Sequence, residues 1–198
     1  MADVSLSLPT GERIALQVYE PAGAVRALVV VPCAMGVAQR YYARFAQWLA
    51  AQGFWTLTFD YRGIGMSAPR NLRELNVDII DWAQVDCASV IDYAKQQHPD
   101  APLFWVGHSL GGQLLGLIPN REKIDRVMTV ATGSGYWLEN SWPTKGMVWW
   151  LWFFVVPITL RVVGLLISAV AATEKATKGT ASKSASSDFL KKFFMISS

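Results

Sequence analysis

The sequence predicts an α/β fold in which a mostly parallel β-sheet carries helices on both of its faces. Two observations lead to this prediction. Through residue 131, apolar runs typical of buried strands alternate with stretches whose apolar residues recur at helical spacing; such alternation is typical of parallel strand–helix–strand units. The 198 residues are 52% hydrophobic and 17% charged, which suits one well-filled core and argues against a disordered chain.

The first two strands are expected to form an antiparallel hairpin. Residues 4–8 alternate apolar and polar side chains with period two, and the stretch around Ile14, Leu16 and Val18 does the same. Between them, residues 9–11 (Pro-Thr-Gly) supply turn residues.

The alternating elements follow this hairpin. Residues 27–31 are a continuous apolar run, which is typical of a strand buried on both faces. A helix is predicted over 37–52, closed by Gly53 at its C-cap. Its apolar positions at helical spacing are Tyr41, Phe45, Trp48 and Leu49. The later predicted elements are a strand over 54–59, a helix over 77–97, a strand over 103–106, a helix from 110 to 117 and a strand over 124–131.

The composition changes after residue 145. Between Lys145 and Glu174 the one charged residue is Arg161, and aromatic side chains crowd into residues 149–154. Residues 173–187 are rich in Ala, Ser, Thr, Lys and Gly, which is typical of a linker. We therefore predict a core over 1–145, an apolar aromatic segment over 146–172 and a low-complexity tail over 173–198.

Charge and cysteine usage limit the partners and the compartment. The net charge is only +3 and the basic residues are scattered, whereas nucleic-acid binding needs a concentrated basic face. The two cysteines, Cys33 and Cys87, make no disulfide framework, and no secretory signal precedes the first strand. We therefore expect a cytoplasmic protein that binds no nucleic acid.

The strongest sign of chemistry is the sequence Gly107-His108-Ser109-Leu110-Gly111, between a predicted strand and a predicted helix. A serine nucleophile in this place sits on a sharp turn that holds its hydroxyl clear of the sheet. Glycines two positions before and after it leave room for the strained backbone. This pattern predicts Ser109 as a nucleophile; the alternative is an ordinary glycine-rich turn.

Two loops after earlier strands agree with this interpretation. In the 32–36 loop (Pro-Cys-Ala-Met-Gly), the backbone N–H of either Ala34 or Met35 could join that of Leu110 to hold a developing oxyanion. The alternative is a plain strand–helix connection. The 60–67 loop contains two glycines and a charge pair; we expect a structural role, with substrate contact as the alternative.

The stretch 107–112 and the 60–67 loop together resemble the α/β-hydrolase superfamily, in its serine aminopeptidase, esterase and monoglyceride-lipase-like branch. The resemblance covers about residues 1–160. It implies that Ser109 is the nucleophile, that Leu110 and the 32–36 loop form the oxyanion hole, and that an ester, lipid or amide acyl group is transferred to water. The implied substrate is a small acyl compound or a peptide, with no metal or organic cofactor. An acid and then a histidine are expected after the nucleophile.

This chain departs from that pattern because no histidine follows Ser109. Of its two histidines, His108 sits in the turn itself, and His98 lies in a helix-to-strand connection, at the sheet edge opposite the site. Glu139 is the first acidic residue after the strand over 124–131, where some members place their acid.

We therefore expect the catalytic histidine and acid to be absent, the last strands of the fold to be missing, and the chain to be truncated or frame-altered and inactive as it stands. The alternatives are a non-catalytic remnant, a membrane-associated binding module, and completion by a partner chain that supplies the histidine. The sequence sets neither the oligomeric state nor the substrate.

Residues 147–172 admit three interpretations. We favour a lid whose aromatic face covers an acyl pocket. The length also suits a membrane segment, although Pro157 and Arg161 lie near its middle and an arginine at mid-bilayer costs about 3 kcal/mol. An ordinary core helix is the third interpretation.

Overall fold

The computed structural model describes residues 1–69, 75–133, 141–159 and 161–162. It divides into two compact units, Met1–Gly133 and Ser134–Ser198, and each is described by itself. The three-part division suggested by composition stays a prediction. The predicted tail over 173–198 lies outside the described residues, as does Glu139.

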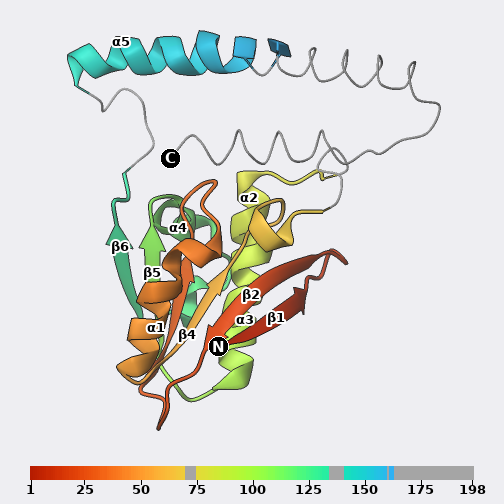
Figure 1. The fold of residues 1–198 in the computed structure, drawn as a ribbon, viewed down its shortest axis with the longest axis vertical. Helices are drawn as coiled ribbons and strands as arrows, with labels where there is room; N and C mark the ends of the chain where they lie inside the picture. The colour runs from red at the N-terminus through yellow and green to blue at the C-terminus, as the bar shows by residue number, and fades with distance from the viewer. Residues whose placement is uncertain (70–74, 134–140, 160, 163–198) are drawn as a thin grey trace, which may run out of the picture. The chain divides into compact units, whose positions relative to one another are not determined.

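Unit 1 is built on a six-stranded sheet with the order β1-β2-β4-β3-β5-β6 (Figure 1). Its first two strands form the predicted antiparallel hairpin, and β2 pairs antiparallel with β4. The pairs β3–β4, β3–β5 and β5–β6 are parallel, so the predicted mostly parallel sheet is confirmed. The strands are β1 (Ala2–Ser7), β2 (Arg13–Tyr19), β3 (Ala27–Pro32), β4 (Phe54–Phe59), β5 (Leu103–His108) and β6 (Arg126–Val130).

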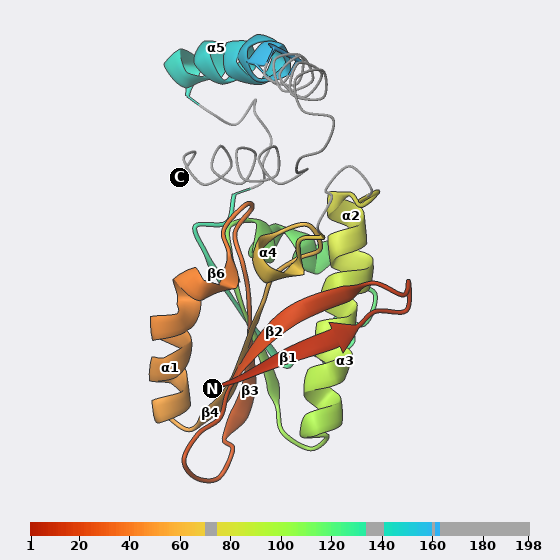
Figure 2. The same ribbon diagram turned by 45° about the vertical axis from the view of Figure 1, so that its right-hand side comes forward.

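Helices cover both faces of this sheet, and Figure 2 shows α1 on one side and α3 on the other. Each predicted helix is confirmed in place but is composite. The pieces are η1 (Gln39–Tyr42, 3₁₀) with α1 (Ala43–Ala51), α2 (Ile79–Asp81) with η4 (Trp82–Cys87, π-helical) and α3 (Ala88–Gln97), and α4 (Leu110–Gln113) with η5 (Leu114–Leu117, 3₁₀). Two short 3₁₀ turns, η2 (Gly65–Ser67) and η6 (Arg121–Lys123), lie in loops.

The helix predicted over 77–97 begins at Ile79 because Asp78 caps it. The Asp78 carboxylate accepts hydrogen bonds from the N–H groups of Ile80 and Asp81, and the Asp81 side chain accepts the Asp78 N–H in return. This reciprocal arrangement satisfies N–H groups that a helix start leaves without partners.

Of the four apolar positions in the helix predicted over 37–52, one, Leu49, is buried. Tyr41, Phe45 and Trp48 are 74%, 40% and 57% exposed, whereas Tyr42, Ala46 and Leu49 are buried. Ala46 has no exposed area, and the larger rings of Phe45 and Trp48 stack on each other at the exposed face, with centroids 6.1 Å apart.

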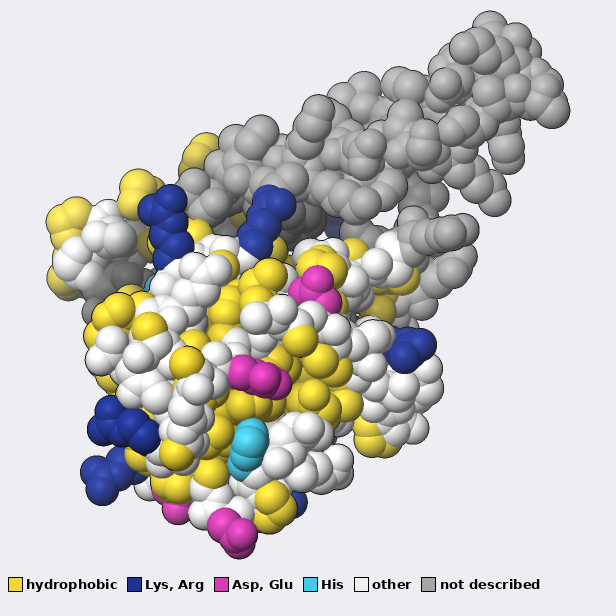
Figure 3. Space-filling view, turned by 60° about the horizontal axis from the view of Figure 1, so that its bottom comes forward, with side chains coloured by type: hydrophobic (Ala, Val, Ile, Leu, Met, Phe, Trp, Pro, Cys, Tyr) yellow, Lys and Arg dark blue, Asp and Glu magenta, His cyan; other side chains and the backbone are white. Residues whose placement is uncertain are grey.

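The core of unit 1 lies between the sheet and these helices. Every residue of β3 is buried, as the apolar run predicts. Leu28, Leu57 and Trp105 have no exposed area, and fully burying one such side chain contributes about 1.5–3 kcal/mol. In contrast, every residue of β6 is exposed. Figure 3 shows hydrophobic side chains gathered into a continuous area on one face of the molecule.

Unit 2 contains α5 (Trp142–Trp150) followed by η8 (Leu151–Val155, π-helical). Pro143 stands in the first turn of α5, where its missing N–H costs nothing. No residue of α5 is buried. The three interpretations of residues 147–172 stay predictions, and residues 160 and 163–172 of this segment lie outside the described residues. Among the helices that the structure describes, none is long and apolar enough to cross a membrane.

Candidate active site

The backbone at Ser109 makes the sharp turn that the sequence predicts. Ser109 stands between β5 and α4 with φ 49° and ψ −110°, a conformation that residues other than glycine rarely adopt. Its N–H donates to the Val130 carbonyl at 2.9 Å, and its carbonyl accepts the N–H groups of Gly112 at 3.0 Å and Gln113 at 3.2 Å. These hydrogen bonds fix the turn from both sides.

Glycines allow the turn to be this tight. A Cβ on Gly107 would come within 2.6 Å of the Gly112 nitrogen, and one on Gly111 within 2.6 Å of the Pro32 carbonyl oxygen. The Trp105 indole N–H donates to the Gly111 carbonyl at 2.9 Å. The start of α4 therefore lies directly against the end of β3, where the 32–36 loop begins.

In the 32–36 loop, the sequence left open whether Ala34 or Met35 supplies the oxyanion-hole N–H, and the structure shows different surroundings for the two N–H groups. The Ala34 N–H donates to the Tyr42 hydroxyl oxygen at 2.9 Å. For the Met35 N–H, the structure records no hydrogen-bond partner among the described residues. Cys33 is buried, its thiol donates to the Phe59 carbonyl at 3.2 Å, and burial raises the pKa of this thiol well above its usual value.

Both histidines of the chain are described, and neither contacts the Ser109 hydroxyl by a hydrogen bond. His108 Nδ1 lies 2.8 Å from the Tyr42 hydroxyl oxygen. The His98 ring packs edge-on against Trp55 with centroids 5.4 Å apart. Trp55 is near the start of β4, whereas Ser109 follows the end of β5. His98 therefore lies at the opposite ends of the parallel strands from Ser109, as predicted.

The 60–67 loop is held by a buried carboxylate. Asp60 accepts the Gln39 N–H at 2.7 Å and the Met66 N–H at 2.9 Å, and burial raises the pKa of this carboxyl. The Ser67 hydroxyl donates to the Asp60 carbonyl at 2.6 Å and accepts the Ala15 N–H at 2.8 Å. These contacts fit the structural role expected for the loop.

Sequence reasoning missed the partners of Arg62 in the same loop. The guanidinium Nε lies 2.6 Å from Asp86 and Nη1 lies 2.6 Å from Glu12. Burial raises the pKa of Asp86 to about 6, although the neighbouring Arg62 favours the ionised form. The separations along the chain, 24 and 50 residues, left no local signal that could reveal these pairs.

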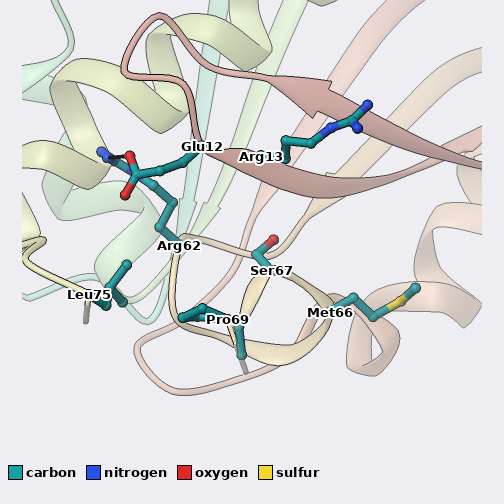
Figure 4. A pocket seen from close by; sticks show the side chains of 8 residues that line it. Glu12, Arg13, Arg62, Met66, Ser67, Pro69 and Leu75 are labelled. Carbon is teal, nitrogen blue, oxygen red and sulfur yellow. Dashed lines mark hydrogen bonds and ion pairs between the residues drawn. The ribbon is translucent and has the colours of Figure 1, made fainter. Parts of the chain in front are cut away.

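A cavity of about 370 Å³ adjoins this ion pair, and Figure 4 shows Glu12 reaching toward Arg62 at its wall. None of the four predicted site residues lines this cavity; these are Ala34, Met35, Ser109 and Leu110. The lining residues are Glu12, Arg13, Arg62, Met66, Ser67, Ala68, Pro69 and Leu75. Within the described ranges, no group of three or more His, Cys, Asp and Glu side chains is placed to hold a metal ion.

Solved structures share this arrangement. A thermostable carboxyl esterase from Bacillus coagulans matches with a TM-score of 0.56 and 20% identity, over 65% of this chain and 43% of that one. An α/β serine hydrolase homologue from Coxiella burnetii matches with a TM-score of 0.56 and 17% identity, over 68% and 64%. A soluble variant of monoglyceride lipase from Saccharomyces cerevisiae matches with a TM-score of 0.53 and 19% identity, over 65% and 43%.

The strand order, the covering helices and these similarities define an α/β-hydrolase fold, which confirms the resemblance noted in the sequence. The chain belongs to the serine aminopeptidase S33 family, whose sequence model matches residues 23–189. It spans between 43% and 64% of the length of the three solved proteins above.

Proposed function

We propose that this chain supplies the nucleophilic half of a serine-hydrolase site. The observation that carries the proposal is the Ser109 backbone at φ 49° and ψ −110° between β5 and α4. Such a conformation costs about 1–3 kcal/mol and persists only where the surrounding structure enforces it. Here the close contacts of Gly107 and Gly111 enforce it, so the strain supports a role for the side chain that the turn presents.

In the proposed chemistry, the Ser109 hydroxyl oxygen attacks the carbonyl carbon of a small acyl or peptide substrate. Negative charge then develops on the carbonyl oxygen, where two backbone N–H groups would stabilise it. Leu110 supplies one of them, because an N–H at the start of a helix has no partner within the helix. Met35 supplies the other, because the Ala34 N–H already donates to Tyr42.

We propose that neither histidine of this chain serves as the general base. A serine hydroxyl is a weak nucleophile until a neighbouring base accepts its proton, and both histidines have other contacts. Loss of the base in a serine hydrolase lowers turnover by a factor on the order of 10⁶. We therefore propose that this chain by itself reacts once with activated phosphonylating or acylating reagents and does not turn over esters.

A fluorophosphonate probe tests this proposal. Because no base activates the hydroxyl, labelling should be slow, but at high probe concentration it should still reach Ser109 in folded wild-type protein and not in the Ser109→Ala variant, as peptide mass spectrometry would show. Turnover of a nitrophenyl ester should be the same in both proteins. Absence of labelling in folded wild-type protein would remove the nucleophile from the proposal. Ester turnover well above that of Ser109→Ala would show that a base is present.

A binding role without catalysis is the second candidate, and the surface of unit 2 favours it. Trp150 and Phe153 are 59% and 58% exposed, which is typical of side chains that contact an apolar partner.

We propose that residues 147–172 form a lid over an acyl pocket, with membrane contact as the alternative. Co-flotation of the protein with phosphatidylcholine vesicles, reduced in Trp150→Ser, would favour membrane contact over a lid. We also propose a cytoplasmic location and no cofactor.

A further inference from the structure

The Tyr42 hydroxyl joins three segments of the chain. Its oxygen lies 2.9 Å from the Ala34 nitrogen in the 32–36 loop and 2.8 Å from His108 Nδ1 at the end of β5. Tyr42 itself ends η1, and only 7% of its area is exposed. A hydroxyl in this place connects the loop that would hold the oxyanion to the residue directly before Ser109.

The direction of each hydrogen bond follows from the donors available. The Ala34 N–H donates to the Tyr42 oxygen, so the hydroxyl proton must point elsewhere, and a buried hydroxyl usually donates to an acceptor. Within the described residues, the group at hydrogen-bond distance that can accept this proton is His108 Nδ1, 2.8 Å away. Burial raises the pKa of Tyr42 to about 12, which keeps this proton in place at neutral pH. With Nδ1 as the acceptor, the ring proton of His108 lies on Nε2.

We propose that Tyr42 is a positioning residue, which ties the 32–36 loop to the end of β5 and leaves the Met35 N–H as the free donor of the oxyanion hole. The inference rests on the proposed function. If the Ala34 N–H were released, the loop could rotate and neither donor would keep its direction. A displacement of about 1 Å in such a site can slow a reaction by as much as about 100-fold.

The Tyr42→Phe variant separates this role from that of an ordinary core tyrosine. It removes the hydroxyl and keeps the ring, which contacts His108 edge-on with centroids 5.9 Å apart. Tyr41→Phe is the matched control, because the adjacent Tyr41 is 74% exposed. We expect fluorophosphonate labelling of Ser109 to slow by about 10- to 100-fold in Tyr42→Phe and to be unchanged in Tyr41→Phe.

Nuclear magnetic resonance tests the hydrogen bonds without any reaction. In wild-type protein, the Ala34 amide should be protected from hydrogen exchange and the His108 nitrogen shifts should show the Nε2–H tautomer. Both features should be lost in Tyr42→Phe and kept in Tyr41→Phe. If Tyr42→Phe does not fold, His108→Phe removes the same link from its other end, and labelling should again be slower.

Three results would overturn the inference. If the Ala34 amide and the His108 tautomer are the same in Tyr42→Phe as in wild type, the hydrogen bonds themselves are wrong. If they change while labelling keeps its rate, Tyr42 positions nothing. If wild-type protein is not labelled, the proposed function fails and the positioning role fails with it, although the resonance measurements still show whether the hydrogen bonds exist.

Discussion

The neighbouring strands β5 and β6 differ sharply although they are paired in register from Phe104–Arg126 to His108–Val130. Along β5, buried and half-buried residues alternate, and the strand leads into the tightly packed turn at Ser109. Along β6 every residue is exposed. In a parallel sheet, strands are stabilised by cover on both faces, and the described part of the chain provides this cover for β5 and not for β6.

This difference matters for the candidate site because the two strands meet there. The Ser109 N–H donates to the carbonyl of Val130, the last residue of β6, and the Thr132 hydroxyl donates to the Ser109 carbonyl at 3.2 Å. The nucleophile turn is therefore fixed by glycine contacts on one side and by an exposed strand on the other.

Matched truncations in the two strands should give the largest contrast. Trp105 and Val127 are direct partners in the sheet, but Trp105 has no exposed area while Val127 is 47% exposed. We expect Trp105→Ala to lower the free energy of unfolding by about 3–5 kcal/mol, and Val127→Ala by no more than about 1 kcal/mol. Urea denaturation measures both values. Equal costs would show that β6 is covered in solution.

Glycine substitutions should show how closely α4 approaches β3. Gly111→Ala places a Cβ within 2.6 Å of the Pro32 carbonyl oxygen, whereas a Cβ on Gly116 meets nothing within 4 Å. Because the backbone cannot yield easily, Gly111→Ala should destabilise the protein by about 3 kcal/mol. Gly116→Ala should change stability by less than about 1 kcal/mol. A tolerated Gly111→Ala would contradict the tight turn.

The free energy of unfolding should also depend on pH, through the buried Asp86. Its pKa of about 6 in the folded protein exceeds the value of about 3.9 for an unperturbed carboxyl. Folding therefore favours the protonated form, so this stabilisation is complete below about pH 4 and is lost as the pH rises through about 6. The change amounts to about 3 kcal/mol.

Unfolding measured between pH 4 and pH 7 tests this sign. The decline in stability attributed to Asp86 should vanish in Asp86→Asn, although that variant is less stable overall because Arg62 loses a buried partner. Asp100→Asn, at an exposed position, should keep the wild-type slope. A slope that survives in Asp86→Asn would assign the effect to other groups.

Relief of strain at the nucleophile is the smallest predicted effect. Glycine adopts positive φ without steric cost, so Ser109→Gly should raise the free energy of unfolding by up to about 1 kcal/mol. Ser109→Ala retains the Cβ and should leave stability unchanged. If Ser109→Gly were destabilising, the turn would not be strained in the way described.

The sequence predicted those parts of the fold that depend on local patterns. The apolar run at 27–31 indicated a buried strand, and the glycines around Ser109 indicated the sharp turn. Long-range partners were not predictable. Which face of α1 is buried depends on the sheet that the helix packs against, and the apolar residues Phe45 and Trp48 lie on its exposed face. The choice between Ala34 and Met35 as oxyanion-hole donor rests on the Tyr42 hydroxyl, which accepts the Ala34 N–H and comes from another segment of the chain.

The dependence of Ser109 phosphonylation on pH tests the central claim, which is a positioned nucleophile with no imidazole base. We predict that the rate of fluorophosphonate labelling rises steadily from pH 5 to pH 9, because hydroxide and no side chain removes the proton. A rate that levels off with a midpoint near 6.5, the usual pKa of histidine, would show that an imidazole serves Ser109 and would contradict the account.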